Sequence, residues 1–200
     1  MPTAVTRAEV VDPPRAALGS FLRGIIAFLD RKKLTARVRV LVSPETNKLM
    51  DHPPFVFHWV GSTAVDEIEA ALQKLGGPEL CHELGLELSR AIGGSIVQPV
   101  LRAAFFLFGE TPEAVFGHLD RFFSLPLRGI TFEWRPPVDG VGVIEARFNG
   151  PNTPEAAYHV LQGSLQWVFD DLLKKPGRVE RVKIAHADEI ESRVTFDVRF

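Results

Sequence analysis

The sequence is poor in the features that usually reveal a function. It has one cysteine, Cys81, which excludes an internal disulfide and a multi-cysteine zinc site. No run approaches the roughly 20 apolar residues that a membrane helix requires. The 23 basic and 25 acidic residues give a formal net charge of -2, whereas a dedicated nucleic-acid binder would carry a basic face. We therefore expect neither nucleic-acid binding nor membrane insertion.

The N-terminal residues also lack a targeting signal. Residues 1–15 show little pattern, end near Asp12-Pro13-Pro14, and have no apolar core of the signal-peptide type. We expect residues 1–15 to form a flexible arm, residues 16–200 to form a single domain, and the chain to be cytoplasmic. A hydrophobic content of 46% is ample for the core of such a domain.

The first half of the sequence has the spacing of helices. The pattern predicts helices over 18–31, 64–75 and 78–108, the last interrupted at Gly93-Gly94. Shorter helices are expected over 34–41 and from Pro44 to the loop that begins at Asp51. Ser43, Thr111 and Thr153 each precede Pro-Glu, a pattern typical of helix starts. Residues 95–108 are apolar nearly all round, which indicates burial or a subunit interface. The interface candidates on this segment are Val97, Leu101 and Ala104.

The second half changes to a period of two. Residues 130–134 and 144–148 alternate apolar and polar side chains around a turn at Pro136–Gly140, and residues 182–184 and 193–200 predict a second pair of strands. Amphipathic helices are expected over 112–124 and over 154–173. The fold class is therefore α+β, with a helical N-terminal half packed on a four-stranded antiparallel sheet that one long helix crosses.

This order of elements resembles a known superfamily. The segments that carry the resemblance are Leu119–Phe123, Arg135-Pro136-Pro137 and the final strand Phe196–Phe200. They resemble the superfamily of heme-NO/oxygen-binding sensors, 4-vinyl-reductase domains and Bet3-type TRAPP subunits. Within it, the proline-rich loop before Trp59 and the helix Glu83–Leu88 are similar to a paralogous family of myxobacterial proteins of about 200 residues and unknown function.

The sequence departs from the heme sensors at the positions that the resemblance would assign to heme. Phe122-Phe123 stand where those sensors have a proximal histidine, and His118 lies about one turn earlier. Phe148, Gly150 and Asn152 stand where a Tyr-x-Ser-x-Arg motif would hold the propionates, and none offers the charge-assisted contact of arginine. We therefore expect no heme and no other cofactor.

Aromatic residues supply the candidates for a ligand pocket. The sequence has fifteen phenylalanines, and several gather over 105–132. The candidates are Phe105, Phe108, Phe116, His118, Phe122, Phe132 and Trp134. They either wall a cavity between the helices and the sheet or fill the core, and we favour the filled core because most aromatic clusters are packed.

Two further polar groups have ordinary explanations. His58 beside Trp59 either lines the mouth of a pocket or belongs to a buried aromatic cluster, which we favour. Cys81 and His82 are adjacent on a helix and so point about 100° apart, which does not suit a nucleophile pair. We interpret Cys81 as an apolar filler.

Three functions compete at this point. The first is a non-enzymatic regulatory or protein-interaction module that acts as a homodimer, because residues 95–108 are apolar and no catalytic constellation is evident. The alternative is a sensor domain that binds a hydrophobic small molecule in an aromatic-lined cavity. An enzyme ranks last, because no polar groups converge in the sequence.

Overall fold

Helices fill the N-terminal half of the chain and strands dominate the C-terminal half. The computed structural model describes residues 14–92, 105, 109–150, 153–187 and 190–200. The first half contains β1 (Ala16–Leu18), α1 (Gly19–Arg31), α2 (Thr35–Arg39), α3 (Pro44–Asp51), β2 (Trp59–Gly61) and α4 (Thr63–Ile92). The second half contains α6 (Pro112–Phe116), α7 (Leu119–Phe123), β3 (Leu127–Arg128), β4 (Ile130–Val138), β5 (Val141–Asn149), α8 (Glu155–Trp167), the π-helical segment η2 (Val168–Leu173), β6 (Arg178–Ala187) and β7 (Glu191–Arg199).

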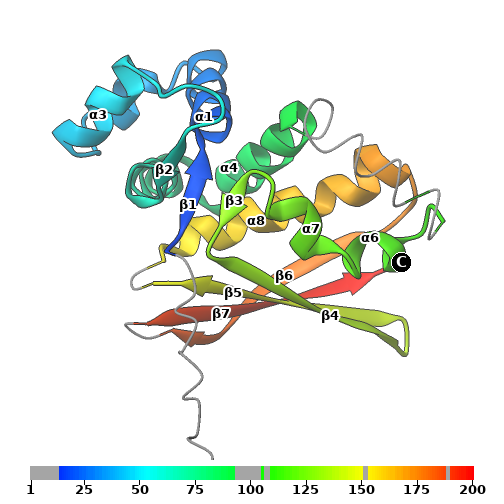
Figure 1. Ribbon diagram of the computed structural model, residues 1–200. Coiled ribbons are helices and arrows are strands. Elements are labelled where there is room, and N and C mark those ends of the chain that lie inside the picture. Colours follow the sequence, from blue (N-terminus) through cyan, green and yellow to red (C-terminus); the bar gives the residue numbers. More distant parts are fainter. Residues whose placement is uncertain (1–13, 93–104, 106–108, 151–152, 188–189) are drawn as a thin grey trace, which may run out of the picture.

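The C-terminal strands form the predicted antiparallel sheet, in the order β4-β5-β7-β6. The register aligns apolar side chains across the strands: Ile144 lies opposite Trp134 on one side and Phe196 on the other. Val194, Phe196 and Val198 are fully buried. The sheet therefore turns an apolar face toward the helices, and α8 runs across that face (Figure 1).

Charged side chains occupy the opposite face of the sheet. Glu133 and Glu145 lie directly opposite each other on β4 and β5. Arg135 bonds to both carboxylates at 3.1 and 2.9 Å, and Arg147 bonds to both at 3.4 and 3.1 Å. The two arginines thus neutralise a carboxylate pair that would otherwise repel, as expected for a solvated face.

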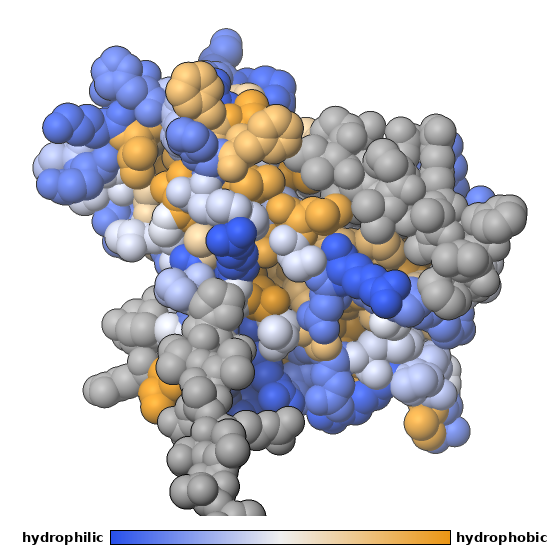
Figure 2. Space-filling model, viewed as in Figure 1, coloured by the Kyte–Doolittle hydropathy of each residue, from blue (hydrophilic) through white to orange (hydrophobic). Residues whose placement is uncertain are grey.

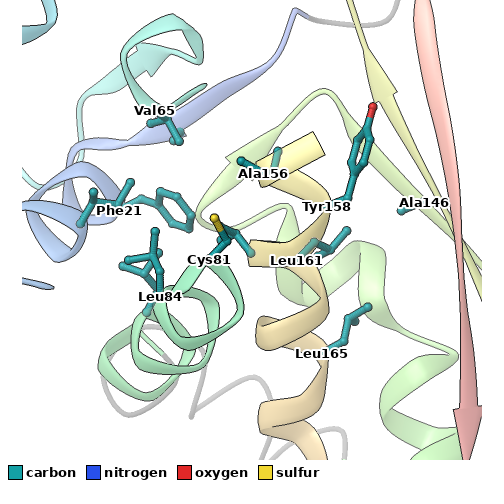
Figure 3. Close-up of a cluster of buried hydrophobic side chains, with 14 of the residues drawn as sticks. Phe21, Val65, Cys81, Leu84, Ala146, Ala156, Tyr158, Leu161 and Leu165 are labelled. Carbon is teal, nitrogen blue, oxygen red and sulfur yellow. The ribbon is translucent and has the colours of Figure 1, made fainter. Parts of the chain in front are cut away.

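Helix α8 also packs against α4, and this contact joins the two halves. Side chains from α1, α4 and α8 converge on one core, where Phe21 and Cys81 face Ala156 and Leu161 (Figure 3). Cys81 is fully buried, as its interpretation as a filler predicted. Gly77 has φ 73° and ψ -170°, so α4 bends at the Gly76-Gly77 pair where the sequence predicted a helix end.

Two predicted helices are interrupted in the structure. The helix predicted over 112–124 is split into α6 and α7, because His118 leaves helical geometry at φ -128° and ψ 21°. The helix predicted over 154–173 changes to π-helical geometry at Val168. Ser43 and Thr111 cap their helices as predicted, by accepting from the amides of Thr46 and Ala114. Thr153 does not cap α8, because Pro154 takes the N-cap position and leaves the Thr153 hydroxyl buried without a partner.

A small second sheet joins the ends of the helical half. β1 pairs antiparallel with β2 on one side and with β3 on the other. The sequence did not predict it, because strands of two or three residues carry no periodic signal. Arg15, which we assigned to the N-terminal arm, directly precedes β1 and is held by Asp66 of α4.

The aromatic loop before β2 differs from the favoured expectation of a buried cluster. Phe55 and Phe57 are each 76% exposed, and Phe55 meets His58 edge-on at 5.6 Å on the surface. The reason is the backbone: the amides of Gly19 and Ser20 bond to the loop carbonyls of His58 and Val56. The loop is thereby fixed at the start of α1, with its rings pointing outward.

Within the described ranges, no helix combines the length and the apolar character that a membrane span needs. The interface candidates Val97, Leu101 and Ala104, and the pocket candidate Phe108, lie outside the described residues.

Candidate functional site

Two adjoining cavities lie where the helical half meets the second half. Each has a volume of about 60 Å³. Four residues line both cavities and form the partition between them: Phe21, Phe123, Leu127 and Ser164. Figure 2 shows apolar atoms along this seam, between the N-terminal helices and the sheet.

The first, which we call the apolar cavity, lies among helices. Its described walls come from α1, α4, α6, α7, α8, η2 and the short strand β3, and no described residue of the larger sheet lines it. Leu88, Leu119 and Phe122 are buried around it. Among the described lining residues, the hydroxyl groups belong to Ser89 and Ser164, and Ser164 already donates to the carbonyl of Gly85 at 3.2 Å. Such a cavity favours an apolar occupant over water.

The second, which we call the acidic cavity, lies beneath the small sheet and reaches the larger one at Ile130 and Phe148. The charged residues Arg15, Asp66, Glu69 and Arg128 line it together with two serines and apolar side chains. Arg15 donates to both carboxylate oxygens of Asp66, at 3.0 and 2.6 Å. Burial nevertheless raises the pKa of Asp66 above its ordinary value, against the lowering effect of Arg15.

Glu69 is the most perturbed group of this cavity. Its residue is only 3% exposed. Burial raises the pKa of the Glu69 carboxyl to about 8, and the charge of Asp66 adds to the rise while Arg15 opposes it. Its backbone carbonyl accepts from the Cys81 thiol at 3.7 Å. Burial, followed by the Glu69 charge, raises the pKa of that thiol to about 12, so Cys81 is not a nucleophile.

The sequence analysis did not identify Arg15, Asp66 or Glu69 as site residues, although the sequence carries one signal for Glu69. Glu69 lies four residues after Val65 and three before Leu72, so it falls on the apolar stripe of its helix. A carboxylate on the buried face of a helix is unusual enough to mark a candidate site. The pairing of Arg15 with Asp66 spans 51 positions and left no local pattern.

Comparison with known proteins gives a result at the level of structure only. No family model matches the sequence, and no curated protein matches it. Solved structures do match. One is an oxygen-binding H-NOX domain related to soluble guanylate cyclases, in its oxygen complex, with a TM-score of 0.61 and 15% identity over 91% of this chain and 94% of that chain.

Further structures of the same kind agree. One, from work on heme distortion in the H-NOX family, has a TM-score of 0.63 and 15% identity over 91% of this chain and 94% of that chain. Another, the Fe(II) unliganded H-NOX protein from K. algicida, has a TM-score of 0.58 and 10% identity over 91% and 95% of the two chains. This chain has an H-NOX-like fold. The fold that the resemblance implied is thus confirmed, while the closer kinship with myxobacterial proteins stays a prediction.

Within the H-NOX-like fold, the predicted pocket residues have different places. Phe122 lines the apolar cavity. Phe116 is 1% exposed and packs between Trp134 and Phe169, with ring centroids at 5.2 and 5.5 Å, so this trio fills the core. Phe132 packs on Phe123 at 4.9 Å. Phe105 is partly buried against the core.

None of the histidines whose side chains the structure describes lines either cavity. His118 is the link between α6 and α7 and does not line either cavity, and the neighbouring Asp120 accepts from the amide of Phe132 at 2.7 Å. His52 and His58 are exposed, and His159 of α8 is partly buried, 3.6 Å from Glu155. Among the residues that the structure describes, no group of three or more His, Cys, Asp or Glu side chains could hold a metal ion.

Proposed function

We propose that this chain is a sensor-type domain that binds a small apolar molecule in the apolar cavity and does not bind heme. The observation that carries the proposal is the cavity itself: an apolar space bounded by α1, α4, α7 and α8, in a fold whose solved neighbours include an oxygen-binding domain. Apolar cavities in proteins remain dry and accept small apolar ligands. The domain carries out no reaction in this account, because the cavity holds no converging polar groups.

The lining of the cavities does not fit heme. A heme iron is held by a histidine, cysteine, methionine or tyrosine side chain. None of the described lining residues of either cavity is of these types, and Phe122-Phe123 occupy the position that the resemblance assigns to the proximal histidine. The volume is also too small, since pockets for ligands of this size measure roughly 300–1,000 Å³.

To test binding, the purified protein is titrated with benzene, toluene and indole. The unfolding temperature and the NMR signals of the methyl groups are measured at each step. We expect benzene to raise the unfolding temperature and to shift the methyl signals of Leu88, Leu119 and Leu172, which line the cavity. Incubation with hemin is the second arm, and we expect no Soret band beyond that of free hemin. A stoichiometric Soret band, or the absence of binding by every apolar probe, would contradict the proposal.

A filled variant controls for nonspecific binding. Ser89 lies at the edge of the apolar cavity on a partly exposed part of α4. Ser89→Leu extends an apolar side chain into the cavity without removing a core contact, so it should weaken benzene binding while the protein stays folded. Ser20→Ala, on α1 outside both linings, serves as the matched control.

The homodimer remains a separate proposal. Its candidates Val97, Leu101 and Ala104 belong to the undescribed segment, and its test is light scattering at micromolar concentration. A monomer at every concentration would remove it without affecting the ligand proposal.

A further inference from the structure

The Glu69 carboxyl is a buried acid without a partner. It belongs to a residue that is 3% exposed, and it lines the acidic cavity. Within the described part of the chain, no side chain or amide donates a hydrogen bond to this carboxyl. Polar groups this deeply buried are normally satisfied, and an exception calls for a ligand, an ion or a functional role.

The neighbouring donors are already engaged. Arg15 directs its guanidinium at Asp66, which also receives a hydrogen bond from the side chain of Ser62. Ser164 donates to the backbone of α4. Arg128 is exposed and stacks on Trp59, with its guanidinium carbon 3.9 Å from the ring centroid. Arg15 is paired with Asp66, and Arg128, which also lines this cavity, lies on Trp59, so among the described residues no cation is paired with the Glu69 carboxyl.

Apart from Arg128, Ser62 and Ser164, the rest of the described lining of this cavity is apolar. Val65, Phe148 and Leu161 face it, and Phe21 and Phe123 separate it from the apolar cavity. Each cavity has a volume of about 60 Å³, so an occupant of this site must be compact. A compact molecule with an apolar body and one polar end would therefore place its body against the partition and its polar end on Glu69.

We propose that the ligand of this domain is a small alkylammonium ion, whose apolar chain lies between Phe21 and Phe123 and whose ammonium group donates hydrogen bonds to the Glu69 carboxylate. This inference rests on the proposed function and extends it, because it adds to the apolar body of the ligand a charged head group that lies in the adjoining acidic cavity. A cation with three donors supplies both the charge and the hydrogen bonds that the carboxylate lacks.

Proton balance gives the proposal a distinctive signature. The charged and titratable groups around this cavity are Asp66 on the same helix as Glu69, Cys81 after the bend of α4, Arg15 ahead of β1 and Arg128 on β3. The described lining from α8 consists of apolar residues and Ser164. At neutral pH the empty site holds a protonated Glu69. An alkylammonium ion enters in its charged form, and the carboxyl proton leaves to the buffer. Binding should release close to one proton and strengthen about tenfold from pH 6 to pH 7.

The experiment compares n-butylamine with 1-butanol, which has nearly the same shape and no charge. Calorimetric titrations in phosphate and in Tris buffer at pH 7 measure affinity and proton release, since the two buffers differ in ionisation enthalpy. They are repeated on Glu69→Gln, which keeps the shape and removes the charge. Glu87→Gln, on the same helix and paired with Arg31 outside both cavities, is the matched control.

We expect n-butylamine to bind more tightly than 1-butanol and to release about one proton. Glu69→Gln should weaken the amine at least about tenfold while leaving 1-butanol within about twofold, and Glu87→Gln should change neither. Equal binding of both probes, with no proton release and no effect of Glu69→Gln, overturns the amine proposal but leaves the apolar cavity as a binding site. Failure of both probes, together with benzene, overturns the proposed function as well.

Discussion

Gly85 of α4 and Gly163 of α8 bring the backbones of the two helices into direct contact. A Cβ atom on Gly85 would lie 1.9 Å from the carbonyl oxygen of Val160, and one on Gly163 would lie 1.9 Å from that of His82. The obstructing atoms belong to helical backbone, which cannot yield as a flexible side chain does. The contact sets the position of α8 between the helical half and the sheet, and thereby one wall of both cavities.

We predict that Gly85→Ala and Gly163→Ala each destabilise the protein by about 2–3 kcal/mol, because the helices must separate to admit a methyl group. Urea unfolding of each variant measures the loss. Gly61→Ala on β2 is the control, since its added Cβ meets no atom within 4 Å and it should change stability by less than about 0.5 kcal/mol. If Gly85→Ala and Gly163→Ala lost no more stability than Gly61→Ala, α4 and α8 would have to be farther apart than described.

Phe122, which lines the apolar cavity, is predicted to contribute substantially to the free energy of unfolding. Phe122→Ala removes a buried ring and should cost about 3–4 kcal/mol, with a larger cavity left behind. Phe57→Ala removes a ring that is 76% exposed and should cost less than about 0.5 kcal/mol. Benzene should recover more stability in Phe122→Ala than in the wild type. Equal costs for the two substitutions would place Phe122 outside the core.

The ion pair of Arg15 with Asp66 leads to a third prediction. The two side chains are 9% and 18% exposed, so Arg15→Met leaves a nearly buried carboxylate without its cation and should cost about 3 kcal/mol at pH 7. The cost should shrink toward pH 4, where Asp66 takes up a proton. The added substitution Asp66→Asn should restore part of the stability. Arg31→Met breaks an exposed pair with Glu87 and should cost less than about 1 kcal/mol.

Glu69 gives the stability of the protein a distinctive pH dependence. Its pKa rises on folding from the ordinary value of 4.5 to about 8, so the folded state holds its proton more tightly than the unfolded state. Such a group stabilises the fold below its unfolded pKa, and this contribution is lost as the pH rises toward the folded pKa. Relative to Glu69→Gln, the wild type should lose about 1.4 kcal/mol for each pH unit between about 5 and 7.5. If the free energies of unfolding of the two proteins changed equally with pH across this range, the burial of the carboxyl would be contradicted.

The sequence predicted the sheet well, for a physical reason. Alternation along 193–200 requires only local information, and Val194, Phe196 and Val198 are buried as that pattern indicated. At the end of the same strand the prediction weakens, because Phe200 lies past the last pairing and remains 43% exposed. Residues 154–173 also kept their apolar face, although the change to π-helical geometry at Val168 carried no recognisable signal.

The candidate site was less accessible to sequence reasoning. Aromatic residues cluster in sequence both where they fill a core, as Phe116 and Trp134 do, and where they line a cavity, as Phe122 does. Only the packing of elements distant in sequence decides between the two. The same holds for Arg15, whose role depends on a small sheet that unites residues near 16, 60 and 128. Glu69 alone left a signal in the sequence, as an acid on an apolar stripe, but the sequence analysis did not use it.

The central claim is that a small apolar molecule enters the cavity bounded by α1, α4, α7 and α8. A crystal of the protein under xenon pressure tests it most directly, because xenon occupies apolar cavities and is located by its anomalous scattering. We expect an anomalous peak between Leu88, Phe122 and Trp167 that Ser89→Leu weakens. A crystal without any peak there, with those side chains in mutual contact, would contradict it.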